Sequence, residues 1–151
     1  MAGASTFNSG STLEMQLNGL TAGTNYDQYA TNGLTLNMTG SVSNVSLLAT
    51  LGFDPTVGDS FTLVDNTSAS AVTGLLKMGS TTLTEGSTFD LTNPGTTKAF
   101  RFQLSYVGST GVGSTGNDVV ATVIPEPSAF TMLAMGIASF VACRRRRRRM
   151  A

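Results

Sequence analysis

Two pairs of carboxylates are the side chains that could most readily support acid–base chemistry. Asp54 lies close to Asp59 in the sequence, and Asp65 could be partnered by Glu85. Glycoside hydrolases use two carboxyl groups placed on either side of a glycosidic bond. Acids scattered over a polar, β-rich surface more often serve as solvated charges, which is the role we expect here. We therefore expect no catalytic residues and keep hydrolysis of carbohydrates as the alternative.

The composition removes most other kinds of active site. The chain has no histidine, and its one cysteine, Cys143, lies near the C-terminus. Ser–His and Cys–His nucleophiles and histidine-ligated zinc are therefore excluded, and one cysteine allows no disulfide framework. A serine activated by Lys77 or Lys98 stays formally possible, although neither lysine has a distinctive sequence context. We expect no metal and no other cofactor.

A glycine-rich stretch has the letters of a nucleotide-binding motif without its setting. Gly111-x-Gly113-x-x-Gly116 matches the dinucleotide fingerprint, which binds pyrophosphate only when a helix follows it. Residues 117–123 alternate instead like a strand. The overlapping residues 113–119 resemble one turn of a calcium-binding β-roll, but such sites need stacked repeats. We expect this stretch to be a flexible hairpin loop.

The C-terminal segment carries the strongest functional pattern. Pro125-Glu126-Pro127 is followed by residues 128–143, which contain no charge. As a helix this stretch would span roughly 24 Å, somewhat less than the bilayer core of about 30 Å, and flanking arginines can extend to the headgroups. A buried core helix is the alternative, but it would gain nothing from the cluster that follows: Arg144, Arg145, Arg146, Arg147, Arg148 and Arg149. The positive-inside rule predicts these arginines on the cytoplasmic side.

The charges are divided sharply between the tail and the rest of the chain. Of nine cations, six form the arginine run, which leaves Lys77, Lys98 and Arg101 against nine acids. The remainder therefore has a net charge of −6, which makes nucleic acid a poor partner. A lipid bilayer is the partner that we expect for the tail.

Period-two alternation predicts strands throughout residues 1–123. A folded β-rich domain is therefore expected ahead of the tail. In residues 11–18, for example, Leu13, Met15 and Leu17 share one face. Asn-Gly, Asp-Pro and Asn-Pro-Gly turns separate the segments, and the strongest are residues 11–18, 33–39, 44–51, 59–65, 99–107 and 117–123. We predict an all-β body, either a sandwich or the end of a β-solenoid. One short C-terminal transmembrane-type helix would follow within residues 124–151.

The tail resembles the PEP-CTERM sorting signal. The resemblance rests on the order of Pro-Glu-Pro, apolar segment and terminal arginine cluster, with Ile124 in place of the usual valine. It implies that Pro125, Glu126 and Pro127 are read by an exosortase, a membrane transpeptidase-like cysteine protease. It further implies an exported envelope protein that is transiently anchored in the inner membrane and then released or attached at the surface.

The body resembles the β-rich C-terminal segment of large autotransporter-like adhesins. The motifs that carry this resemblance are residues 22–28, 58–64, 104–106 and 116–119. The resemblance implies that the body follows a long β-helical passenger. Residues 1–10 lack the basic and apolar regions of a signal peptide, so we expect the chain to be a fragment of a longer exported protein.

Three functions follow as expectations. The first is a noncatalytic surface protein with a structural or adhesive body, whose expected partners are the exosortase for the tail and extracellular polysaccharide for the body. The second is an extracellular carbohydrate-active enzyme or carbohydrate-binding module with the same tail, although the chain has no tryptophan for a sugar platform. The third is a soluble β-domain with an incidental tail.

Overall fold

The described part of the chain consists of strands, turns and loops, without a helix. The computed structural model describes residues 3–108 and 116–126. Within them lie the strands β1 (Ser5–Phe7), β2 (Thr12–Leu17), β3 (Tyr29–Thr31), β4 (Leu34–Leu36), β5 (Met38–Thr39), β6 (Val42–Ser43), β7 (Ser46–Leu51), β8 (Ser60–Asn66), β9 (Leu76–Met78), β10 (Thr81–Leu83), β11 (Thr88–Thr92), β12 (Ala99–Gly108) and β13 (Asp118–Ile124). The prediction of an all-β body is confirmed for these residues.

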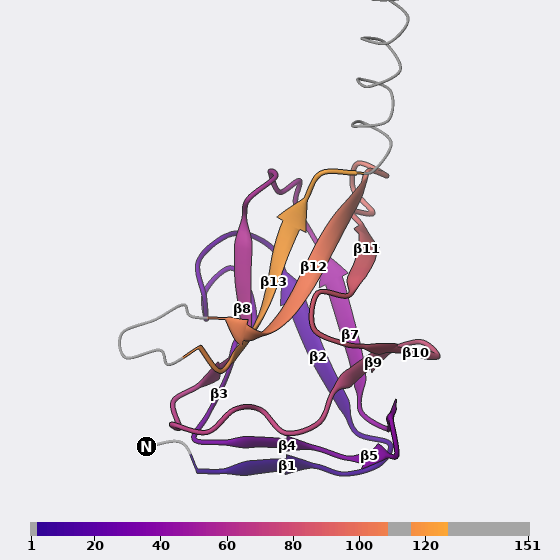
Figure 1. Cartoon of the computed structure of the whole chain (residues 1–151). Helices are drawn as coiled ribbons and strands as arrows, with labels where there is room; N and C mark the ends of the chain where they lie inside the picture. The colour runs from indigo at the N-terminus through magenta and orange to yellow at the C-terminus, as the bar shows by residue number, and fades with distance from the viewer. Residues whose placement is uncertain (1–2, 109–115, 127–151) are drawn as a thin grey trace, which may run out of the picture.

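The first half of the chain winds into two stacked coils. Strands β1, β2 and β3 form one coil, and β4, β7 and β8 form the next, each parallel to its counterpart. Figure 1 shows the three parallel pairs as the sides of a triangle around the core. A third coil begins at Thr73, which bridges to Thr35, and at β9, which pairs parallel with β7. Of the two architectures expected, these parallel coils fit the end of a β-solenoid.

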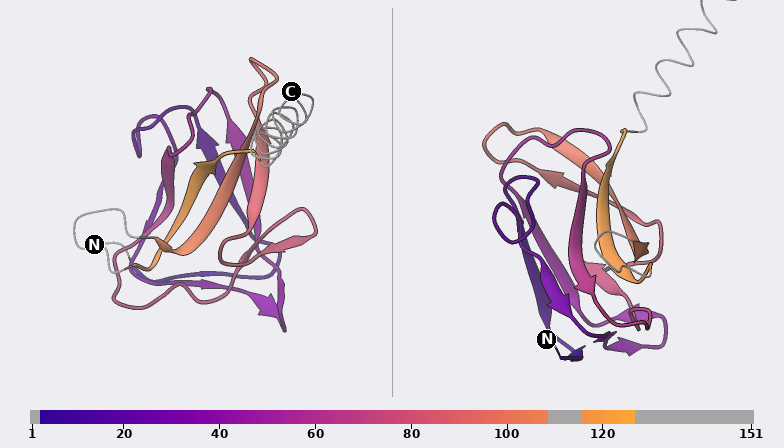
Figure 2. Two further views of the ribbon diagram at one scale, coloured as in Figure 1. Left: turned by 45° about the horizontal axis from the view of Figure 1, so that its top comes forward. Right: turned by 90° about the vertical axis from the view of Figure 1, so that its left-hand side faces the viewer.

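Antiparallel strands close the second coil. Strands β11, β12 and β13 form an antiparallel series, and β13 pairs antiparallel with β8. The resulting five-stranded sheet has the order β11-β12-β13-β8-β3, and the other large sheet has the order β10-β9-β7-β2. Because β13 occupies the edge of β8, no further parallel strand can be added there. Strand β13 is the last strand within the described residues, and Figure 2 shows it in orange beside β12.

The core lies inside the coils and is built around aromatic rings. Phe61, on β8, is fully buried and makes edge contacts with Tyr26 and Phe53. Its third aromatic neighbour is Phe102 on β12, at 6.0 Å between ring centroids. Phe102 in turn stacks on Phe89. Residues from both coils and from the closing strands thus meet at the ring of Phe61. The coils and the antiparallel strands β11, β12 and β13 therefore share a single core.

Buried polar side chains at the ends of β3 and β8 join the two coils by hydrogen bonds. Thr31 and Asn66 occupy paired positions of β3 and β8, and both are buried. Thr31 Oγ1 donates to the Gly33 carbonyl, while Asn66 Oδ1 accepts from the Gly33 N–H at 2.9 Å. The Asn66 N–H donates to Asp118 Oδ1 at 2.9 Å. These bonds satisfy buried backbone groups at the turn and tie β13 to the coils.

A buried tyrosine hydroxyl makes the stability of the fold depend on pH in the alkaline range. Tyr106 accepts a hydrogen bond from the Leu76 N–H and donates one to the Leu83 carbonyl, both at 2.8 Å. Burial, reinforced by the charge of Glu85, raises the pKa of Tyr106 to about 12. The folded state therefore holds this proton more tightly than the unfolded chain, whose tyrosine pKa is about 10. The stabilisation is present below pH 10 and is lost as the pH rises towards 12.

We expect Tyr106→Phe to remove this alkaline dependence and to lower the free energy of unfolding at neutral pH by about 1–3 kcal/mol. The cost arises because two buried backbone groups lose their partner. Denaturant titrations between pH 7 and 12 on both proteins measure the effect. Equal slopes of stability against pH in the two proteins would contradict this account.

The strongly alternating segments were predicted well, and the short ones were missed. Leu13, Met15 and Leu17 are buried as expected, and so are Phe102, Leu104 and Tyr106. The segment 33–39 is divided into β4 and β5, and β1, β3, β6 and β10 were not predicted. These strands have two or three residues each, which is too few for a period to be recognised.

Candidate sorting site and the face around it

Strand β13 leads directly into Pro125 and Glu126, the first two residues of the Pro-Glu-Pro motif. The N–H of Val123 donates to the Asp59 carbonyl at 2.8 Å, and its carbonyl accepts from the Gly58 N–H at 2.9 Å. Ile124 pairs with Arg101 in the register of β12 and β13. Pro125 and Glu126 then leave the sheet and are exposed. The ladder ends here because proline has no N–H to donate.

The turn that holds Val123 needs its glycine. Gly58 has a φ of +98°, a backbone conformation that residues with a side chain rarely adopt. Asp59 stabilises the same turn, because its Oδ2 accepts from the Thr56 N–H at 2.7 Å. The loop between β7 and β8 is thus shaped to bond the last buried residue of β13.

Glu126 lies in the electrostatic field of an arginine on the neighbouring strand. Arg101 forms a two-bond ion pair with Asp90, with Nε to Oδ1 at 2.8 Å and Nη2 to Oδ2 at 2.9 Å. This pair lowers the pKa of Asp90, and it raises the pKa of Arg101, to which the charge of Glu126 also contributes. The carboxylate of Glu126 therefore lies near a cation of the body.

A second ion pair organises the loop between β11 and β12. Asp54 accepts from Lys98 Nζ at 2.8 Å, from Thr96 Oγ1 at 2.6 Å and from Asn93 Nδ2 at 2.7 Å. These bonds, led by the one from Lys98, hold the pKa of Asp54 at about 2. Thr97, within the same loop, has a φ of +58°. Asp54 thus fixes a strained loop beside the end of β13 and serves as an acceptor of structural hydrogen bonds.

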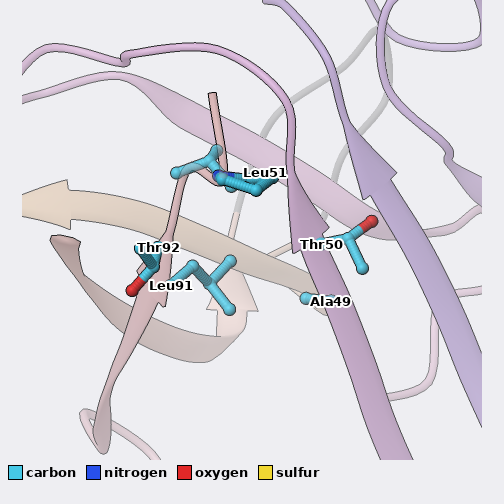
Figure 3. A pocket seen from close by; sticks show the side chains of 6 residues that line it. Ala49, Thr50, Leu51, Leu91 and Thr92 are labelled. Atoms are coloured by element: carbon cyan, nitrogen blue, oxygen red, sulfur yellow. The ribbon is translucent and has the colours of Figure 1, made fainter. Parts of the chain in front are cut away.

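A shallow groove opens between the two large sheets, next to the loop between β11 and β12. It has a volume of about 220 Å³ and lies between β7 and β11 (Figure 3). Its walls are mostly apolar and comprise Ala49, Thr50, Leu51, Leu91, Thr92 and Pro94. The volume is below the roughly 300–1,000 Å³ typical of small-molecule sites, and the groove brings no acid or base into its lining.

The structure places only part of the predicted site. Pro125 and Glu126 lie at the exit of β13, whereas Pro127 and the six arginines from Arg144 to Arg149 are outside the described residues. So is the expected apolar helix of residues 128–143. No helix able to cross a membrane is found within residues 3–108 and 116–126.

Three of the four acids that were weighed as catalytic pairs have structural hydrogen-bond partners, and the fourth, Asp65, lies half-buried on β8. Asp54 and Asp59 bind loop groups, and Glu85 Oε2 accepts from the Tyr106 N–H at 2.6 Å. Within the described ranges, no group of three His, Cys, Asp or Glu residues could hold a metal ion. Asp118, in the stretch compared with a calcium turn, begins β13 and binds Asn66.

The glycine motif does not lead into a helix. Gly111 and Gly113 lie outside the described residues, but Gly116 is followed by β13, a strand, as the sequence predicted. Sequence reasoning missed the bonds from Gly58 and Asp59 to Val123 and the nearness of Arg101 to Glu126. The Gly-Asp turn was visible in the sequence, but its partner could not be read from local pattern.

Comparison with known families identifies the tail. Residues 123–148 match the PEP-CTERM protein-sorting motif, a stretch that covers less than a fifth of the chain. No curated protein and no solved structure matches the chain. A PEP-CTERM motif implies an exported protein of the cell envelope and an exosortase as its processing enzyme. The likeness of the body to autotransporter-like proteins finds no support among homologues.

Proposed function

We propose that this chain is a noncatalytic protein of the bacterial cell envelope whose tail is a cleavable sorting anchor and whose body is structural or adhesive. The observation that carries the proposal is the PEP-CTERM match, which begins within the last residues of β13. Pro125 and Glu126, the first two residues of the motif, follow at once and are exposed. A protease can bind such a segment as an extended chain without unfolding a domain.

In this proposal residues 128–143 cross the inner membrane and hold the precursor there. The arginines from Arg144 to Arg149 stay in the cytoplasm, and the body lies on the outer side. The distribution of charge supports this orientation, since the rest of the chain is acidic and the cations of the tail are gathered at one end. After the exosortase acts, the body is released or attached at the surface.

The body would serve as a spacer or an adhesive module. The two parallel coils support the resemblance to β-helical surface proteins, because stacked coils are the unit from which long solenoids are built. Extracellular polysaccharide is the partner that we propose for it. Hydroxyl and amide side chains are abundant on its exposed surface, and such groups form hydrogen bonds with sugars.

Membrane fractionation tests the anchoring step. In cells without the exosortase, we expect the full-length chain to remain in the membrane pellet after alkaline carbonate extraction. Leu133→Arg combined with Ile137→Arg should move it to the supernatant, because each charge at the centre of a span costs about 2.5–3.5 kcal/mol. Leu48→Arg combined with Val42→Arg, at exposed sites of the body, is the matched control and should stay in the pellet. Extraction of the unaltered chain into the supernatant would contradict the proposal.

A further inference from the structure

Three segments that are distant in the sequence meet where the tail leaves the body. They are residues 52–59, 93–98 and 125–126, which we call the tail-proximal face. Gly58 and Asp59 are bonded to Val123, and Asp54 is bonded to the loop 93–98. Figures 1 and 2 show these loops at the same end of the molecule as the end of β13.

The geometry brings any enzyme that reads the motif against this face. Both backbone groups of Val123 are bonded to the body, and Pro125 is only two residues further along the chain. An extended chain advances by about 3.5 Å per residue, so the motif begins within about 7 Å of the folded surface. A membrane protease that encloses this segment therefore works within a few ångströms of the neighbouring loops.

The face presents apolar side chains beside the motif. Val57 is 62 % exposed at the tip of the loop that holds Val123, and Pro94 is exposed on the next loop. Pro94 also lines the groove between β7 and β11. An apolar side chain exposed beside the motif can be covered by an enzyme that binds the motif, and its burial would then favour binding.

The charges of the face favour a protein over a lipid surface. The three segments contain the acids Asp54, Asp59 and Glu126 and a single cation, Lys98, which is already paired with Asp54. An excess of acids is repelled by anionic phospholipid headgroups, which attract basic segments.

We propose that the tail-proximal face is a docking surface for the exosortase, with Val57 as a central contact, so that the enzyme recognises the folded end of the body together with the motif. This inference rests on the proposed function. It means that cleavage depends on residues that a sorting motif does not contain.

Two matched valines allow a direct test in cells that produce the full chain and the exosortase. Val57 and Val107 are equally exposed, each at 62 %. Val107 lies at the opposite end of β13, because Gly108 pairs with Asp118. We expect Val57→Asp to slow the conversion of precursor to mature protein about tenfold, as for an important interface residue. Val107→Asp should leave the conversion rate unchanged.

The other outcomes separate this inference from the proposed function. Equal rates for the two valine variants would overturn the docking surface, and the proposed function would stand if the Pro125→Ala, Glu126→Ala variant is still not cleaved. Cleavage of that motif variant would overturn the proposed function itself.

A photo-crosslinking amino acid at position 57 identifies what the face touches. With an exosortase whose catalytic cysteine is replaced, we expect an adduct to the enzyme from position 57 and none from position 107. An adduct to phospholipid alone would contradict the docking surface and assign this face to the membrane.

Discussion

Replacing Pro125 and Glu126 together by alanine is expected to leave the chain uncleaved in cells that contain the exosortase. The two residues are exposed at the end of β13 and are not paired in the sheet, so the body should fold as before. Arg101 keeps its two-bond partner Asp90. The loss should therefore fall on recognition alone, and immunoblots of precursor and mature protein measure it.

Glu14→Ala is the control for the motif variant, since it removes an exposed acid of β2 far from the tail in the sequence. We expect it to be processed like the unaltered chain. If the motif variant were converted to the mature size at the normal rate, Pro125 and Glu126 would not be the recognition element. The sequence would then match the sorting motif without being processed through it.

Phe61→Ala is expected to lower the free energy of unfolding by about 3–5 kcal/mol, the range for removing a large buried aromatic ring. Phe61 is completely buried, with ring centroids of Tyr26 at 5.3 Å, Phe53 at 6.1 Å and Phe102 at 6.0 Å. These rings come from both the coils and the closing strands. The cavity would therefore loosen the contact between the two parts of the core.

Denaturant unfolding of the protein recovered from cells measures this effect. Val107→Ala, at a site that is 62 % exposed, is the control and should change stability by less than about 0.5 kcal/mol. A loss below about 1 kcal/mol for Phe61→Ala would mean that the coils and the closing strands do not share one core. A loss confined to one of two unfolding transitions would lead to the same conclusion.

The local features of this fold were predictable, and the pairing of distant segments was not. Leu13, Met15 and Leu17 give β2 its buried face because side chains alternate along a strand. Alternation says nothing about the partner, and β2 pairs with β7 only after the chain has completed a whole coil. Strand β8 shows a further limit. A register shift opposite Val119 and Val120 lets both Leu63 and Val64 be buried, against a simple period of two.

For the tail, too, the local pattern was predictable and the contacts with distant residues were not. The order of motif, apolar segment and arginines is contained in adjacent residues, and it led directly to the sorting motif that the comparison finds at residues 123–148. The surroundings of the motif depend on contacts between residues far apart in the chain. Val123 is held by Gly58 and Asp59, and Glu126 lies near Arg101. Only the folded body shows that Pro125 and Glu126 lie close to a loop that exposes Val57.

The intact mass of the protein, isolated from its own cells with and without the exosortase, tests the central claim most directly. We predict a chain that ends near residues 125–127 when the enzyme is present, and one that retains Arg144–Arg149 when it is absent. The difference in mass would establish the tail as a processed sorting signal. A full-length mass in both strains would contradict this account and would leave residues 128–143 as at most a permanent anchor.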